Sequence, residues 1–161
     1  MAVVFIGIGS NMGEKVENCR RAIDLLAEKI AVKKISSFYE TEPWGVTDQD
    51  DFVNCVVAGE TGLESRRLLT LCKSIEAEIG RVDAPRWGPR IIDLDILFYG
   101  DTVVNESELT IPHARLHERA FVLVPLAEIA PTLVHPLLNK TAGEMLTELN
   151  SSVRIKKLSP M

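Results

Sequence analysis

The fold is decided by the stretch Ile92-Asp93-Leu94-Asp95-Ile96-Leu97-Phe98-Tyr99, whose apolar and β-branched residues predict a strand. It follows two amphipathic helices, predicted over residues 14–30 and 64–79 by apolar positions spaced three and four apart. Earlier apolar runs predict strands at residues 3–8, 32–39 and 52–59. The order β-α-β-β-α-β indicates a ferredoxin-like α+β fold, an antiparallel sheet with two helices on one face.

The rest of the chain predicts small additions to that core. After a turn at residues 100–101, residues 102–104 are expected to return beside the strand. The C-terminal part predicts short helices around 116–119, from about Pro125, and over 142–149. Thr141 and Glu144 form a capping-box pattern at the start of the last one. With no repeat, low-complexity tract or linker, residues 1–161 are expected to form a single domain.

Composition and charge exclude several classes of function. The chain has 161 residues, 46% hydrophobic and 25% charged, which suits one globular domain. A net charge of -5 argues against a nucleic-acid partner, whose phosphates demand a basic face. We find no signal-peptide pattern and no apolar stretch near the roughly 20 residues of a membrane helix. We therefore expect a cytoplasmic protein without nucleic-acid or membrane partners.

Cys19, Cys55 and Cys72 are the three cysteines of the chain. They are odd in number and lie far apart among apolar residues, which matches neither a disulfide framework nor the spacing of zinc ligands. We expect buried free thiols, which fits a reducing compartment.

Two carboxylates lie on one face of the strand at 92–99. Side chains alternate along a strand, so Asp93 and Asp95 share a face while the apolar residues around them share the other. Adjacent like charges cost energy unless water or a cation neutralises them. Magnesium prefers a couple of carboxylates and completes its shell with water and phosphate oxygens. The pair indicates a magnesium site; the alternatives are a solvated edge strand or an Asp93 that caps a turn.

Three arginines precede that strand in a loop rich in proline and glycine, namely Arg81, Arg86 and Arg90. Guanidinium groups bind phosphate oxygens in a fork geometry and keep their charge. A basic loop that leads into two carboxylates is therefore typical of a nucleotide-magnesium site. The alternative is surface ion pairing with the abundant glutamates.

Other signals are weaker. His113 has cationic company in Arg115, His117 and Arg119, whereas His135 is expected to be a turn residue beside a proline. The glycine-rich residues 7–13 open the first helix and could bind a phosphate on their amides. They lack the lysine-threonine pair of a P-loop, so a tight turn is favoured. Residues 41–45 and 52–54 carry aromatic and amide groups suited to a flat heterocycle, although core packing explains Phe52 equally well.

Residues 86–97 closely resemble the signature of the 6-hydroxymethyl-7,8-dihydropterin pyrophosphokinase family of the folate pathway. The likeness continues in order along the chain at residues 8–11, 37–39, Thr41, Pro43, Gly45, Asn54, Glu76, 80–81, 112–113, 119–121 and 125–131. The resemblance implies a ferredoxin-like monomer that transfers the β,γ-pyrophosphoryl unit of ATP to the pterin hydroxymethyl group and releases AMP.

The resemblance also implies the site. Asp93 and Asp95 match residues that hold two magnesium ions between the ATP phosphates and the attacking hydroxyl. Asp95 could also assist deprotonation of that hydroxyl, unless the metal alone lowers its pKa enough. The residues matching catalytic or ATP-binding positions are Arg81, Arg86, Trp87, Arg90, Ile96, Thr110, His113 and Arg119. Those matching the pterin pocket are Thr41, Pro43, Trp44 and Asn54, with Phe52 and Phe121 as the two faces that stack on the ring.

Some positions depart from the family pattern. Asp83, Glu108 and Ala114 stand where members often carry a basic or an aromatic residue, so the hold on the nucleotide could differ. The nearest rival function is a magnesium-dependent phosphotransferase that makes ADP. A non-catalytic ligand-binding module would leave the two aspartates without a task. An RNA-recognition domain is disfavoured by the acidic balance and the missing aromatic-rich motif.

Overall fold

The structure is a computed structural model of the chain and describes residues 1–42, 51–80, 91–149 and 154–158. In its main sheet, β1 (Ala2–Ser10) lies between β4 (Phe52–Thr61) and β5 (Asp93–Tyr99) and pairs antiparallel with both. The strands β2 (Ala31–Ile35) and β3 (Tyr39–Thr41) both pair with β4. The last strand, β8 (Ile155–Lys157), pairs with β3 and completes the order β5-β1-β4-β3-β8.

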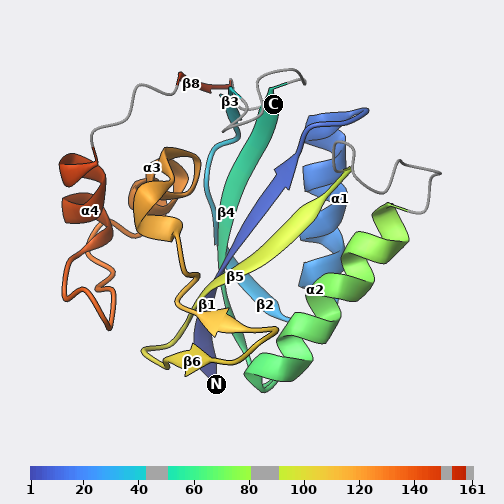
Figure 1. Cartoon of the computed structure of the whole chain (residues 1–161). Helices are drawn as coiled ribbons and strands as arrows, with labels where there is room; N and C mark the ends of the chain where they lie inside the picture. Colours follow the sequence, from blue (N-terminus) through green and yellow to red (C-terminus); the bar gives the residue numbers. More distant parts are fainter. Residues whose placement is uncertain (43–50, 81–90, 150–153, 159–161) are drawn as a thin grey trace.

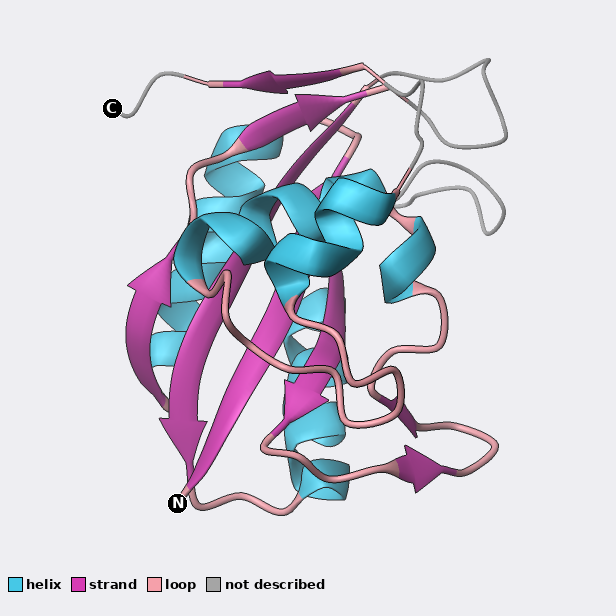
Figure 2. Cartoon of the chain, turned by 90° about the vertical axis from the view of Figure 1, so that its left-hand side faces the viewer, coloured by secondary structure: helices cyan, strands magenta, loops and turns pink. Residues whose placement is uncertain are grey.

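Helices cover both faces of this sheet (Figure 1). On one face lie α1 (Lys15–Ala27) and α2 (Ser65–Ile79), and on the other lie α3 (Ala120–Ile129) and α4 (Ala142–Glu148). Figure 2 looks onto the face that α3 and α4 cover. A small second sheet of β6 (Val104–Asn105) and β7 (Thr110–Ile111) and the 3-10 helix η1 (Leu116–Glu118) connect β5 to α3. The expected ferredoxin-like α+β fold is confirmed.

Strand alternation separates two apolar cores. Toward α1 and α2, the sheet contributes Ile6, Ile8 and Leu94, which pack against helix residues such as Leu26 and Leu68. Toward α3 and α4 a second core forms around fully buried side chains, which include Phe98, Leu123 and Leu126. Each such side chain contributes roughly 1.5–3 kcal/mol by leaving water, so both layers are held firmly to the sheet.

Several element boundaries differ from the sequence prediction. The strand expected at 32–39 is divided into β2 and β3 at Ser36, whose hydroxyl accepts the Val56 N–H at 2.9 Å in place of a backbone carbonyl. Residues 102–104 do not return beside β5, because Val104 pairs with β7. The turn before them is confirmed by the positive φ of Gly100, 54°.

The C-terminal part holds two further differences. The helix expected to begin at Pro125 begins at Ala120, so Pro125 lies inside α3. The packing of buried side chains of α3 against the sheet offsets the one hydrogen bond that a proline removes. The strand β8 was not predicted. The capping box at Thr141 and Glu144 is confirmed, with both of its hydrogen bonds present. No helix in the described ranges is long and apolar enough to cross a membrane.

Candidate active site

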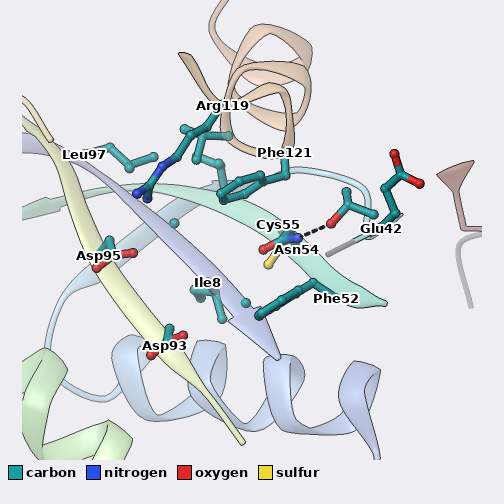
Figure 3. A pocket seen from close by; sticks show the side chains of 15 residues that line it. Ile8, Glu42, Phe52, Asn54, Cys55, Asp93, Asp95, Leu97, Arg119 and Phe121 are labelled. Atoms are coloured by element: carbon teal, nitrogen blue, oxygen red, sulfur yellow. Dashed lines mark hydrogen bonds between the residues drawn. The ribbon is translucent and has the colours of Figure 1, made fainter. Parts of the chain in front are cut away.

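A cavity of about 220 Å³ opens where α3 stops covering its face of the sheet (Figure 3). Five elements contribute to its wall. The strands β1, β3, β4 and β5 supply the floor and one side, and α3 with the residue before it supplies the other. The side chains that line it most directly are Thr41, Glu42, Phe52, Asn54, Asp93, Asp95, Leu97, Arg119 and Phe121.

Two glycines of β1 form the floor between the aspartates and β4. Gly9 lies opposite Asp93 on β5 and Asn54 on β4, and Gly7 lies opposite Asp95. A Cβ atom at Gly9 would lie 2.6 Å from Asn54 Oδ1, so a side chain there would displace the amide. The turn expected within residues 7–13 lies at the end of that segment: β1 continues through both glycines to Ser10, and the chain bends at residues 12–14, where Gly13 has a φ of 73°, before α1 begins. The function of Gly7 and Gly9 is to keep the middle of the cavity open.

The two aspartates share one face of β5, as the alternation predicted. Asp93 is half-buried and Asp95 is exposed, and both line the cavity (Figure 3). The next residue on the face of Asp93 and Asp95 is the apolar Leu97. Leu97 is an extra residue in the pairing with β1, because Ile96 lies opposite Ile6 and Phe98 lies opposite Phe5. This bulge places Leu97 and Phe98 together in the core beneath α3. The carboxylates therefore end where that core begins.

A glutamate from α2 holds the backbone between the aspartates. Glu76 Oε2 accepts the Leu94 N–H at 2.8 Å. Among the strands that the structure describes, β5 is at the edge of the main sheet, so this N–H faces no neighbouring strand there. The sequence identifies Glu76 only as a match to the family pattern and assigns it no role. The signal that could have revealed one is its place beside Cys72, Ile75 and Ile79 on α2, where a carboxylate faces inward.

Arg119 and His113 are two basic side chains close to Asp95. Arg119 immediately precedes α3 and directs its guanidinium toward β5 (Figure 3). The His113 N–H donates to the Leu97 carbonyl at 3.1 Å, which anchors the loop to the end of β5. Burial lowers the pKa of His113; Arg119 lowers it further, and Asp95 opposes both.

A second cavity, of about 260 Å³, lies on the other side of Asp95. Ile96, Thr110 and His113, which the resemblance assigns to ATP binding, all line it. Two departures from the family pattern, Glu108 and Ala114, line it as well. The Glu108 carboxylate lies 3.3 Å from Arg66 of α2 and is thus directed toward that helix. Asp95 lines both cavities and so lies at their boundary.

The first cavity has the aromatic and amide groups that suit a flat ring. Phe52 from β4 and Phe121 from α3 enter it from different elements (Figure 3). Asn54 Nδ2 donates to Thr41 Oγ1 at 2.8 Å, and both side chains are buried. Since Phe52 lines the cavity and is only partly buried, core packing does not explain its place.

The remaining sequence candidates divide into four groups. Arg115 forms an ion pair with Glu118 at 3.1 Å, and His117 lies 3.8 Å from the same residue, so neither joins the cavities. His135 is a turn residue, as expected, and its Nδ1 accepts the N–H groups of Leu137 and Leu138. The three cysteines are free and buried. Pro43, Trp44, Arg81, Asp83, Arg86, Trp87 and Arg90 lie outside the described residues.

Comparison with known proteins gives a consistent result. Residues 5–131 match the family model described as 7,8-dihydro-6-hydroxymethylpterin-pyrophosphokinase. The chain is 46% identical to the 2-amino-4-hydroxy-6-hydroxymethyldihydropteridine pyrophosphokinase of Methylorubrum extorquens, over 94% of this chain and 96% of that protein. A protein of the same name from Aquifex aeolicus is 40% identical, with 92% of each chain covered.

Similarity also extends to larger proteins. The chain is 44% identical to a folic acid synthesis protein of Schizosaccharomyces pombe, over 92% of this chain and 21% of that one. The crystal structure of wild-type Plasmodium falciparum HPPK-DHPS with pteroate superposes with a TM-score of 0.74 at 16% identity, and covers 91% of this chain and 44% of that one. At that identity the superposition supports the fold alone.

Proposed function

The chain belongs to the 7,8-dihydro-6-hydroxymethylpterin pyrophosphokinase family, and we propose that its two cavities hold the two substrates on either side of Asp95. The reaction transfers pyrophosphate from ATP to the hydroxymethyl group of the dihydropterin in folate biosynthesis. The pterin hydroxyl oxygen bonds to the β-phosphorus, the bond from that phosphorus to the α-phosphate oxygen breaks, and AMP leaves while the hydroxyl loses its proton. The observation that carries the proposal is the position of Asp95 at the boundary of both cavities.

The cavity of about 220 Å³ is the proposed pterin site. Phe52 and Phe121 offer aromatic faces for the ring, and stacking of this kind favours a flat heterocycle. Asn54 and Thr41 form a buried polar pair that can meet the hydrogen-bonding edge of the pterin. We assign Pro43 and Trp44 to the same site on the family resemblance. The floor at Gly7 and Gly9 leaves room for the ring beside the carboxylates.

The two aspartates are the proposed ligands of two magnesium ions. The described residues contain no group of three or more histidine, cysteine, aspartate or glutamate side chains that could hold a metal alone. Asp93 and Asp95 are hard oxygen donors on one face, which fits magnesium, because this ion commonly takes a couple of carboxylates and completes its shell with water and phosphate oxygens. When bound, the ions would neutralise the charge that develops on the transferred phosphates.

The cavity of about 260 Å³ is the proposed nucleotide site. Ile96 and Thr110 line its nucleoside side, and His113 can donate a hydrogen bond to a phosphate oxygen. Arg119 directs its charge toward the space beside Asp95, where phosphates would bridge the two cavities (Figure 3). On the family resemblance, we assign Arg81, Arg86, Trp87 and Arg90 to the same phosphates.

This arrangement performs transfer without a covalent intermediate. Phosphoryl transfer requires in-line positioning and neutralisation of charge, both of which the charged groups around Asp95 can supply. Asp95 can also accept the hydroxyl proton, because it faces the pterin cavity and the nucleotide cavity at once. On the family resemblance, we propose that the protein acts as a monomer. Its three buried free thiols support a cytoplasmic location.

The deciding experiment identifies the products. The protein is incubated with γ-labelled ATP, magnesium and 6-hydroxymethyl-7,8-dihydropterin, and the mixture is separated by chromatography. We expect equal amounts of AMP and a labelled pterin diphosphate, and loss of both when EDTA removes the metal. ADP with a pterin monophosphate would instead indicate attack at the γ-phosphorus by an ordinary phosphotransferase. Turnover that persists in EDTA would contradict the magnesium site.

A further inference from the structure

The C-terminal strand β8 lies beside the proposed pterin cavity, although it is outside the part of the chain that matches the family model. That match ends at residue 131, whereas β8 spans Ile155–Lys157. β8 pairs antiparallel with β3, with Ile155 opposite Thr41 and Lys157 opposite Tyr39. Thr41 is a wall residue of the cavity, so β8 extends the sheet directly next to that wall.

Arg154, which precedes β8, contacts two chain segments at the cavity rim. Its N–H donates to Glu42 Oε1 at 3.1 Å, and its carbonyl accepts the Glu42 N–H at 3.2 Å. Its guanidinium nitrogen lies 3.5 Å from Asp51 Oδ2. Glu42 lines the cavity itself, and Asp51 directly precedes the lining residue Phe52. One residue thus ties together the segment that leaves β3 and the segment that enters β4.

β8 also contacts the opposite wall of the cavity. Lys157 Nζ lies 3.9 Å from Glu128 Oε2, and Glu128 belongs to α3, the helix that carries Phe121. The same glutamate accepts hydrogen bonds from the Ser37 hydroxyl at 2.7 Å and the Tyr39 hydroxyl at 2.9 Å. The C-terminal strand is therefore attached to the strand side and to the helix side of the cavity.

These contacts are suited to fixing positions more than to adding stability. The Arg154 side chain is 73% exposed, and an ion pair this open contributes little to the free energy of unfolding. The contacts of Arg154 instead hold the rim residues Glu42 and Asp51 in place before a ligand binds. Without these contacts, the rim would have to become ordered during binding. Preorganisation of this kind strengthens binding by reducing the entropy lost on association.

We propose that Arg154 is a positioning residue for the pterin: it holds Glu42 and the start of β4 in place, so that β8 is a functional part of the pterin cavity. The inference rests on the proposed placement of the pterin in this cavity. It predicts an effect on the affinity for the pterin, with the affinity for ATP and the rate of transfer at saturation left unchanged.

Matched variants separate the contacts of Arg154. Arg154→Ala removes the ion pair with Asp51 and keeps the backbone N–H, while Arg154→Pro removes that N–H as well. Lys156→Ala is the control, because Lys156 lies on the same strand, is exposed and faces Glu40 across the ladder. We expect KM for the pterin to rise about threefold in Arg154→Ala and about tenfold in Arg154→Pro, with kcat and KM for ATP close to wild type.

The dissociation constant of the pterin, measured by titration in the absence of ATP, should rise in parallel. In a double-mutant cycle, Asp51→Asn should raise KM for the pterin as Arg154→Ala does, and the double variant should add nothing further. Unchanged pterin affinity in Arg154→Ala, or a change no larger than in Lys156→Ala, would overturn the inference even if Arg154→Pro did not fold. If the wild type forms AMP and binds the pterin normally, that failure concerns Arg154 alone; if the wild type does neither, the proposed function fails with it.

Discussion

The two cavities on either side of Asp95 are built in different ways. The proposed pterin cavity takes its floor from register in the sheet, where Gly9 lies between Asp93 and Asn54, and its polar pair is buried. The proposed nucleotide cavity takes much of its lining from the segment between β5 and η1, which includes Thr110 and His113. A site made by strand register is preformed by the fold itself. A site made largely by connecting segments depends more on which side chains they carry, and Glu108 and Ala114 are the positions that differ from the family pattern there.

The largest effect is expected where the two cavities meet. Asp95→Asn keeps the shape of the side chain and removes the charge that would bind magnesium, so turnover should fall about a thousandfold or more. Because Asp95 is exposed, the thermal unfolding midpoint should stay near the wild-type value. The measurement is kcat over a magnesium titration, with circular dichroism to verify folding.

The matched control for Asp95 is Asp101→Asn. Asp101 is an exposed aspartate in the turn after β5 and lines neither cavity. It should leave turnover nearly unchanged. Normal magnesium-dependent turnover in Asp95→Asn would mean that the boundary between the cavities is not the reaction centre.

The next effect should be confined to the pterin cavity. Asn54→Ala removes the amide that is hydrogen-bonded to Thr41 at 2.8 Å and leaves a buried hydroxyl without that partner. KM for the pterin should rise by about 30-fold, which corresponds to about 2 kcal/mol, the usual range for such a loss. KM for ATP should change little, because Asn54 does not line the nucleotide cavity. The measurement is steady-state kinetics with each substrate varied in turn. If KM for ATP rose as much as KM for the pterin, the division of the site into two cavities would be wrong.

How much of this site the sequence predicts depends on the kind of structure involved. The period of two along a strand is sufficient to place Asp93 and Asp95 on one face. It gives no information about which residues lie across the sheet, so Gly9 was interpreted as part of a turn although it lies inside β1. That register depends on long-range pairing of three strands, which no local pattern encodes.

The segments that the sequence missed share a physical cause. β8 is three residues long and reads Ile-Lys-Lys, without the alternation that marks a strand, and it forms because β3 offers a free edge. Pro125 lies inside a helix because tertiary packing of α3 outweighs the local preference for a helix start. The pterin-side residues Thr41, Phe52, Asn54 and Phe121 were identified through the family resemblance, and the structure brings them together in one cavity.

A smaller effect should separate the two glycines of the floor. Gly9→Ala would place its methyl group 2.6 Å from Asn54 Oδ1, so the amide must move and KM for the pterin should rise by about tenfold. Gly7→Ala is the matched comparison: it also places a methyl group at the floor of the cavity, but that group would meet Leu97 at 3.5 Å, an ordinary contact, so the effect on pterin binding should be smaller. Titration of the pterin in the absence of ATP measures both variants. If Gly7→Ala weakened binding more than Gly9→Ala, the position of Asn54 would not be what sets the affinity.

The smallest effect concerns the link between the two walls of the pterin cavity, and it depends on pH. Burial raises the pKa of Tyr39 to about 12, and its hydrogen bond to Glu128 and the negative charge of that carboxylate act in the same direction. The neutral phenol therefore contributes stability that is fully present below the ordinary tyrosine pKa near 10 and is lost as the pH rises from 10 toward 12.

Tyr39→Phe tests this link because it removes the titrating group while keeping the ring. The free energy of unfolding, measured in urea at intervals from pH 8 to pH 12, should fall more steeply for the wild type than for Tyr39→Phe. The difference in that loss should not exceed about 2 kcal/mol, since one pKa unit corresponds to about 1.4 kcal/mol and the pairing is partly solvated. Lys156→Ala is a useful control: it removes an exposed lysine of the same strand, one that faces Glu40 across the ladder, and leaves the tyrosine hydroxyl and its contact with Glu128 in place, so its alkaline slope should match the wild type. Parallel alkaline slopes for the wild type and Tyr39→Phe would mean that the hydroxyl does not couple α3 to β3, and the polar link between the two walls would then depend on the contacts of Ser37 and Lys157 with Glu128.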